Sequence, residues 1–215
     1  MDIVRIPKEQ LLEFGIRPSF DTRVYFNHNK LVGNLFWRRF QKMLEMAGPG
    51  KRGVALDFGC GHGMFLPSLS KHYKKVIGID IKTHPETKKI LRYYGCTNVT
   101  VAARNGGDTH FKDDYFDVIF CADVLEHFRD LDVPLREIRR ILKPNGRLIV
   151  NSPLETWFFR ASRALAGYSK PADHYHSAAE IYEKINEMFT IEEKYDYPNF
   201  FGKLVLLEII KAVKE

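Results

Sequence analysis

A glycine-rich loop directly follows the first strand-like run, and its residues could hold a polar or anionic ligand. The apolar run Val54–Phe58 contains Asp57, and residues 59–63 have the sequence Gly-Cys-Gly-His-Gly. Glycines allow positive φ angles and let a ligand approach the backbone, and N–H groups at the start of a following helix attract polar or anionic groups. The pattern therefore predicts a cofactor-binding turn between a strand and a helix.

A second acidic residue lies where it could bind the sugar of a nucleoside. Asp80 ends the next strand-like run, residues 76–80. At the carboxyl edge of a doubly wound sheet, such a carboxylate can accept hydrogen bonds from ribose hydroxyls. Two nucleotide fingerprints do not fit this loop. A dinucleotide loop would need glycine or alanine in place of Met64, and the Gly-Lys-Ser/Thr of a Walker loop is absent.

Short strand-like runs and helical patterns alternate between residues 53 and 152. This alternation predicts a parallel sheet covered by helices on both faces. No crossover helix fits between the last two strand-like runs, so we expect them to form an antiparallel pair. Helices are expected at residues 29–46 and 178–188. The expected strands are residues 54–58, 76–80, 99–101, 116–120, 147–150, 190–197 and 203–210.

These motifs resemble those of the class I S-adenosylmethionine-dependent methyltransferases. Residues 57–63 match the Asp-x-Gly-x-Gly-x-Gly pattern of the family's first motif. Residues 79–80 resemble its ribose-binding motif, residues 116–121 its fourth strand, and residues 138–146 the helix and turn before its fifth strand. The resemblance covers about residues 51–153. It implies an α/β fold, namely a Rossmann-like, doubly wound, seven-stranded and mostly parallel sheet with the last strand antiparallel, and S-adenosyl-L-methionine as the cofactor.

The resemblance also implies roles for individual residues. The loop glycines would line the methionine part of the cofactor, Asp57 would orient its amino group, and Asp80 would hold its ribose. Relatives often place an acidic residue near the adenine after the third strand. Asn105 aligns with that position here, and Asp108 is the rival assignment. The candidate cofactor-binding residues are Asp57, Gly59, Cys60, Gly61, Gly63, Asp80, Ile81, Asn105, Asp108 and Cys121.

The segment after the fourth strand carries three side chains that could act on a substrate. Asp123, Glu126 and His127 have the i, i+3, i+4 spacing of one helical face. They resemble the Glu-x-x-Glu-His group implicated in metal binding by ubiquinone-pathway O-methyltransferases. A pocket-lining or structural role is the alternative, and no metal is predicted.

Two more histidines precede the helix at residues 178–188. His174 and His176 are candidate general bases because an unperturbed histidine titrates near neutrality. For His176, a contact at the helix N-terminus with Ser177 as the cap is the alternative. The candidate catalytic residues are His127, His174 and His176.

Residues 156–172 contain aromatic and basic side chains but no acidic one. Such a segment can be a lid that packs its aromatic stripe on the core, or an amphipathic helix at a lipid interface. The first interpretation predicts a cover over the acceptor, and the second predicts a peripheral membrane contact. We expect residues 1–50 to form an N-terminal helical cap and residues 51–215 a single methyltransferase domain with a helical insertion at about 155–175.

The expected activity is methyl transfer from S-adenosylmethionine to a small-molecule or lipid-like acceptor. Aromatic residues before Gly48 and after Glu155 would enclose an apolar site. The Asn/Asp-Pro-Pro-Tyr/Phe motif of adenine- and glutamine-directed methyltransferases is missing, which argues against methylation of bases or glutamine by that mechanism. Other routes to RNA stay open, but nucleic acid is not the favoured partner. RNA or protein methylation is the alternative, supported only by the excess of 33 basic over 27 acidic residues. A non-catalytic cofactor-binding partner protein is a third interpretation, and the sequence leaves the oligomeric state open.

Length and composition are those of one globular unit in a reducing compartment. A chain of 215 residues can bury a sizeable core without disulfides. Its three cysteines include no Cys-x-x-Cys pair, and its apolar runs are too short to cross a bilayer or to form a signal segment. These features predict a cytoplasmic protein. Surface or turn positions account for the remaining histidines, which have no paired carboxylate or cysteine at ligand spacing: His28, His62, His72, His84 and His110.

Overall fold

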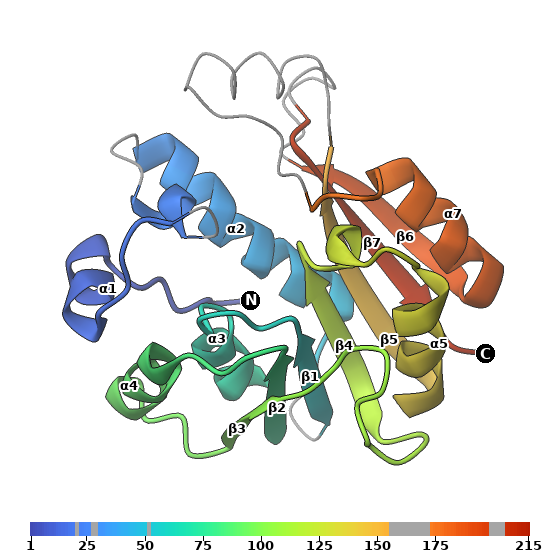
Figure 1. Ribbon diagram of the computed structural model, residues 1–215, viewed down its shortest axis with the longest axis horizontal. Helices are drawn as coiled ribbons and strands as arrows, with labels where there is room; N and C mark the ends of the chain where they lie inside the picture. The colour runs from blue at the N-terminus through green and yellow to red at the C-terminus, as the bar shows by residue number, and fades with distance from the viewer. Residues whose placement is uncertain (20–21, 27–29, 51–52, 155–172, 198–204) are drawn as a thin grey trace.

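The fold is built on one seven-stranded sheet (Figure 1). The computed structural model describes residues 1–19, 22–26, 30–50, 53–154, 173–197 and 205–215. The strand order is β3-β2-β1-β4-β5-β7-β6, so the chain moves outward from β1 and then returns to β4 on the other side of it. Ligands of open α/β sheets bind where the strand order reverses in this way. The topology therefore places the expected site at the carboxyl ends of β1 and β4.

Five parallel strands form the body of the sheet. They are β1 (Val54–Phe58), β2 (Lys75–Asp80), β3 (Val99–Ala103), β4 (Phe116–Ala122) and β5 (Leu142–Pro153). Phe58 pairs with Ile79 on one side and with Cys121 on the other. The ends of β1, β2 and β4 are therefore level, and the residues that follow them meet at one edge.

Helices cover both faces of the sheet, as the continuous apolar strands predict. Figure 1 shows α1 (Lys8–Phe14) and α2 (Lys30–Ala47) on one side and α5 (Asp132–Ile141) and α7 (Ala178–Met188) on the other. The helices α3 (Leu66–His72) and α4 (Pro85–Tyr93) contribute to the same apolar cluster as α1 and α2. Neighbouring residues of β4 alternate between the two cores, since Phe120 belongs to one cluster and Cys121 to the other.

The last two strands close the sheet as an antiparallel pair. β7 (Leu207–Val213) runs antiparallel to β5 and to β6 (Thr190–Tyr197), which confirms the expected topology. The helix α7 precedes β6 and begins after Ser177, whose side chain forms a capping box with Glu180. Ser177 is thus the helix cap named in the alternative interpretation of His176.

The N-terminal segment packs on the sheet through α2. The short 3₁₀ helix η1 (Arg23–Phe26) lies beside α2, and α2 packs against β5 and β7. Phe40 stacks on Phe65 with ring centroids 4.3 Å apart, and Trp37 and Met43 are buried with it. The described part of residues 1–50 therefore shares an apolar core with the sheet. That these residues form a separate N-terminal cap remains a prediction.

The structure corrects three expectations about local structure. Asp123, Glu126 and His127 do not share a helical face, because only Leu125–His127 is helical, as the 3₁₀ turn η2, and Asp123 has a φ of 51°. The strand β5 is longer than residues 147–150. The strand β7 begins at Leu207, so residues 205–206 lie outside it, and residues 203–204 of the expected strand are not among the described residues.

Two further expectations concern membranes and the cover. The aromatic-basic segment 156–172 lies outside the described residues. Within the described ranges, no helix combines the length and the apolar character needed to cross a bilayer.

Candidate active site

The carboxyl ends of β1, β2 and β4 open into a cavity of about 730 Å³. Its walls come from the glycine loop after β1, the residues after β2, the turn after β4, η1 and α2. Ordinary binding pockets for small molecules have volumes in this range. The structure brings eight of the predicted site residues to this cavity: Asp57, Gly59, Cys60, Gly61, Asp80, Ile81, His127 and His174.

The glycine loop has the backbone conformation that the sequence pattern predicts. Gly59 has a φ of 78°, and a Cβ atom there would lie 2.3 Å from Cγ2 of Val124. Gly61 has a φ of 49°, and among the described residues no heavy atom lies within 4 Å of the position of its Cβ. Gly59 therefore allows close packing of the loop, whereas Gly61 leaves open space in which a ligand can approach the backbone.

Asp80 holds the loop in place. The Gly61 N–H donates to Oδ2 of Asp80 over 2.8 Å, and the N–H groups of Gly59 and Cys60 donate to the carbonyl oxygen of Ile79 over 2.8 and 2.9 Å. An ionised carboxylate offers about four acceptor positions on its two oxygens. Asp80 therefore retains acceptor positions for a ligand while it fixes the turn.

Asp57 is a buried carboxyl group on the cavity wall. Only 2% of the residue is exposed, and its Oδ2 atom has no hydrogen-bond partner within the described ranges. Burial, and to a lesser degree the charge of Asp80, raises the pKa of Asp57 to about 7. A buried carboxyl oxygen without a hydrogen-bond partner is a suitable acceptor for a cationic ligand group such as an ammonium, whose charge would favour the ionised carboxylate.

Apolar groups line the cavity next to Asp80. Ile81 is 82% exposed, an unusual value for isoleucine. The rings of Phe58 and Phe128 lie 6.1 Å apart between centroids, and a Cβ on Gly106 would lie 2.5 Å from the Phe58 ring. Together these groups make this part of the cavity wall apolar, which suits a flat, weakly polar ring.

Neither rival residue for the adenine end has its side chain on the cavity wall. Asn105 is exposed, and its side-chain oxygen accepts from the Gly107 N–H over 2.9 Å. Asp108 is exposed as well and forms a backbone bridge with Asn105. Gly106 lies between them in the same turn, and it is one of the residues that line the cavity. The adenine roles of Asn105 and Asp108 remain predictions.

Three other predicted site residues are not among those that line the cavity. A Cβ on Gly63 would lie 2.6 Å from Cγ2 of Thr87, so Gly63 packs the loop against α4. Cys121 is fully buried in the opposite core because of the alternation along β4. His176 shares a hydrogen bond with the carbonyl oxygen of Arg129 over 3.3 Å.

Burial raises the pKa values of the Cys60 and Cys121 thiols, which makes both poor nucleophiles.

A buried ion pair joins α2 to the turn after β4. The guanidinium of Arg39 donates to Asp123 and, over 3.1 Å, to the hydroxyl of Tyr25, and the Asn151 amide also donates to Asp123. The Arg39 side chain is 6% exposed, and its charged group lies 4.8 Å from the centroid of the Phe40 ring. Burial alone would lower the pKa of Arg39, but the interactions with Asp123 and Tyr25 together outweigh it and raise that pKa, so Arg39 stays charged.

Glu126 is a second buried acid on the cavity wall. It is 1% exposed, and both of its carboxyl oxygens have no partner in the part of the chain that the structure describes. Burial is the main cause that raises its pKa well above the usual range, and the charge of Asp123 adds to it. The raised pKa favours the neutral form of Glu126, in which a carboxyl group can donate a hydrogen bond.

His127 and His174 meet beside Glu126. Their rings lie 4.8 Å apart between centroids in an edge-to-face arrangement. Nδ1 of His127 shares a hydrogen bond with Oδ2 of Asp173 over 3.0 Å. A carboxylate on one ring nitrogen fixes the tautomer and leaves the other nitrogen as an acceptor. The arrangement can remove a proton from a substrate hydroxyl.

Comparison with known proteins decides what kind of domain carries this cavity. Residues 56–150 match the protein family described as "Methyltransferase domain". These residues are a class I S-adenosylmethionine-dependent methyltransferase domain. The predicted family and fold are thereby confirmed, and with the family its cofactor, S-adenosylmethionine.

Curated relatives of the methyltransferase domain include enzymes of quinone biosynthesis. The chain is 30% identical over 110 residues to a ubiquinone biosynthesis O-methyltransferase of Bradyrhizobium diazoefficiens, covering 47% of this chain and 40% of the relative. It is 32% identical over 143 residues to the ubiquinone/menaquinone biosynthesis C-methyltransferase UbiE of Vibrio vulnificus, covering 62% and 53%. The chain thus spans about half the length of these relatives.

Solved structures show the same fold. The geranyl diphosphate C-methyltransferase of Streptomyces coelicolor superposes with a TM-score of 0.68 and 14% identity, over 86% of this chain and 81% of that one. At this identity the likeness concerns the methyltransferase fold alone.

Sequence reasoning missed Arg39 and Tyr25, which lie outside the matched methyltransferase domain. One signal for Arg39 was present in the sequence. It lies between Phe36 and Phe40, on the apolar stripe of an amphipathic helix, where a charged residue needs a buried partner. The partner itself, Asp123, is 84 residues away and is set by the tertiary fold.

Proposed function

We propose that this protein transfers a methyl group from S-adenosylmethionine to a small-molecule or lipid-like acceptor. The observation that carries the proposal is the continuity of one cavity. It joins the glycine loop and Asp80 at one end to the buried groups Arg39 and Glu126 and the half-buried His127 at the other. Such a cavity accommodates a cofactor and a small acceptor side by side.

The acceptor class is further supported by the relatives and by the walls of the cavity. Two curated relatives are named for quinone biosynthesis. The walls include the apolar side chains Phe36, Phe40 and Met64 next to the buried polar groups. Apolar walls with a few placed polar groups are typical of pockets for small organic molecules. A hydroxylated aromatic compound with an apolar tail, similar to a quinol, has the matching chemistry.

The chain's own residues can hold the cofactor without a metal. S-adenosylmethionine supplies an activated methyl group on a positively charged sulfur. Asp80 would accept hydrogen bonds from the ribose hydroxyls, and Asp57 would accept from the ammonium of the methionine part. The open space at Gly61 and the apolar wall at Ile81 fit the remainder. The residues present therefore fit this group.

At the acceptor end, the chain would align a nucleophile and receive its proton. Alignment of the two reactants supplies most of the rate in such a transfer. His127, oriented by Asp173, would take the proton of an acceptor hydroxyl. Neutral Glu126 would donate a hydrogen bond to the acceptor. His174 would pack against His127 and fix its ring.

The raised pKa of Asp57 predicts a pH dependence of cofactor affinity. Below a pH of about 7 the free protein carries Asp57 in the neutral form, which binds an ammonium weakly. As the pH rises, the carboxylate forms and affinity increases. For S-adenosylhomocysteine, the demethylated product, we expect about an eightfold gain between pH 6.0 and 7.5.

Calorimetric titration at several pH values measures this gain. Asp57→Asn should remove the pH dependence, whereas Asp113→Asn, an exposed aspartate paired with Arg140, should keep it. An affinity for S-adenosylhomocysteine that stays constant over this pH range in the unaltered protein would contradict the role of Asp57.

Transfer of a labelled methyl group tests the proposed function itself. The protein is incubated with methyl-labelled S-adenosylmethionine and an alkylated catechol, or with total RNA, or with a protein extract. We expect label in the catechol fraction that an organic solvent extracts. His127→Asn should lower kcat by about 100-fold, because general base catalysis is typically worth 10²–10⁴-fold. His176→Asn is the matched control, since His176 is not among the cavity-lining residues.

The three substrates separate the alternatives. Label in RNA or protein, without label in small molecules, would replace the proposed acceptor with a macromolecule. Binding of S-adenosylhomocysteine without transfer to any substrate would instead support a non-catalytic cofactor-binding protein.

A further inference from the structure

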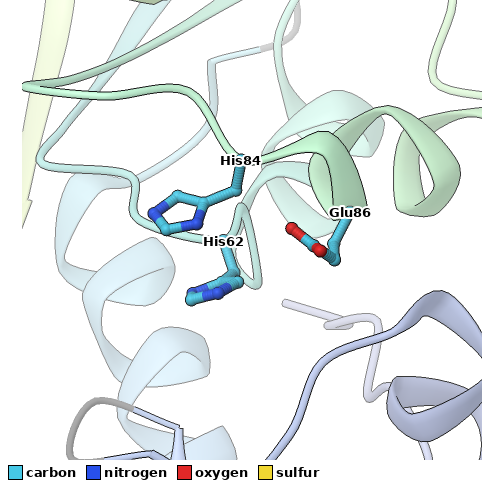
Figure 2. Close-up of side chains that lie close together, drawn as sticks. All are labelled: His62, His84 and Glu86. Carbon is cyan, nitrogen blue, oxygen red and sulfur yellow. The ribbon is translucent and has the colours of Figure 1, made fainter.

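We propose that His62, His84 and Glu86 form a binding site for a divalent transition-metal ion. Figure 2 shows the three side chains gathered where the glycine loop meets the start of α4. The loop contributes His62, and the residues at the beginning of α4 contribute His84 and Glu86. Sequence reasoning assigned both histidines to surface or turn positions, because neither has a partner at ligand spacing along the chain. The fold supplies that partner.

The three potential ligand atoms lie close enough to share one ion. One ring nitrogen of each histidine and one carboxylate oxygen of Glu86 all lie within 4.8 Å of one another. The two rings are stacked, with centroids 3.9 Å apart and planes at 29°. Ligand atoms bound to one zinc ion at about 2.0–2.1 Å are roughly 3.3 Å apart. Metal binding would therefore require the two rings to rotate out of the stack, so that their nitrogens converge on the ion.

The backbone holds these donors in a fixed arrangement. His62 lies between Gly61 and Gly63, which both have positive φ angles. His84 precedes Pro85, whose ring fixes the first turn of α4, and the His84 side chain makes no capping hydrogen bond to the helix. All three side chains are half-buried. The ligands therefore come from two well-defined elements.

The donor set selects the class of metal. Two imidazole nitrogens and one carboxylate suit zinc, nickel, copper or cobalt, whereas magnesium and calcium prefer oxygen ligands only. Three protein ligands leave at least one position of a tetrahedral ion open to water or to a bound molecule. The site is thus of the open kind.

The position of the site links it to the cavity. His62 and His84 both line the cavity, on the side of the glycine loop. An ion held here would tie the loop between Gly61 and Gly63 to α4. The inference does not rest on the proposed function, because metal binding can be measured without cofactor or acceptor.

Titration of the metal-free protein with Zn²⁺ tests the proposal. We expect binding that His84→Ala weakens at least about 100-fold, since even the loss of a group behind a ligand typically costs 10–100-fold. Glu86→Gln, which preserves the shape of the side chain, should weaken binding less. His110→Ala is the matched control, because His110 is an exposed histidine paired with Asp108.

A second group of donors, Glu126, His127 and His174, also lies within metal-binding distance and requires its own control. Zn²⁺ affinity at the proposed site should be unchanged in His127→Ala. Loss of binding in His127→Ala with full binding in His84→Ala would place the ion at the other group and overturn the proposal. Absence of Zn²⁺ binding to the unaltered protein would show that the two rings merely stack.

Cobalt provides a readout that does not depend on stability. Co²⁺ bound through imidazole nitrogens has a visible absorption spectrum that changes with its ligands. The spectrum of the unaltered protein should change in His62→Ala and in His84→Ala and stay the same in His110→Ala. Thermal unfolding without metal identifies any variant that has failed to fold. If an alanine variant fails to fold, Glu86→Gln replaces it in the spectral comparison.

Discussion

Replacement of Arg39 with methionine is expected to lower the free energy of unfolding by about 3 kcal/mol. Arg39 is the cation that balances Asp123 in the wall of the cavity. Removal of one partner of a buried ion pair leaves an uncompensated charge and costs about 3–5 kcal/mol. The Asp123 side chain is 30% exposed and still receives the Asn151 amide, which places the expected loss at the lower end.

Urea-induced unfolding measures this loss. Arg38→Met is the matched control, because Arg38 is the exposed neighbour on the same helix and should change the free energy of unfolding by less than about 0.5 kcal/mol. The double variant Arg39→Met/Asp123→Asn should recover most of the lost stability, since it removes the unbalanced charge. If Arg39→Met unfolds at the same urea concentration as the unaltered protein, the ion pair does not stabilise the fold.

Replacement of Asp80 with alanine is expected to reduce the affinity for S-adenosylhomocysteine by a factor of about 10² to 10⁴. The proposed role of Asp80 involves two hydrogen bonds to the ribose, each worth about 1.5–3 kcal/mol when one partner is charged. The variant also loses the bond between Asp80 and the Gly61 N–H, which holds the glycine loop. Asp80→Asn keeps an acceptor for that N–H and should show an intermediate loss.

Calorimetric titration of the three forms gives these affinities. Asp108→Ala is the control, and it also tests the rival assignment at the adenine end. Because the exposed Asp108 side chain is not among the cavity-lining groups, its loss should change affinity by less than about twofold. Equal affinities for Asp80→Ala and the unaltered protein would remove Asp80 from the cofactor site.

The cofactor end of the site could be predicted from the sequence, because short continuous segments determine it. The loop from Asp57 to Gly63 combines a strand end with a turn that needs positive φ angles, and the helix α3 begins soon after it, at Leu66. Each of these leaves a local signal in residue type. The alternation of apolar runs and helices predicts the parallel strands in turn. Asp80 could be located by the same reasoning because it ends the next strand.

The acceptor end of the cavity depends on contacts between distant segments. Arg39 reaches Asp123 from α2, and His127 meets Asp173 and His174 from the segment before α7. The spacing of these residues along the chain does not predict these contacts, because they depend on how the helices pack on the sheet. The helical face expected for residues 123–127 failed for a related reason. The positive φ of Asp123 is fixed by tertiary partners, and the helical spacing alone gives no sign of it.

The group at His62, His84 and Glu86 illustrates the same limit. His62 belongs to a loop defined by its glycines, and His84 precedes a proline at the start of a helix. Each was accounted for by its local surroundings. Their stacking requires that β1 and β2 be parallel neighbours, because this pairing brings together the two segments that follow these strands.

A crystal structure of the protein grown with S-adenosylhomocysteine tests the central claim most directly. We expect density for one ligand in the cavity, with its ribose hydroxyls on the Asp80 carboxylate, its ammonium on Asp57 and its adenine beside Ile81. Density for the ligand elsewhere, or an unchanged cavity at a ligand concentration that saturates binding in solution, would contradict the proposal that this cavity holds the methyl donor.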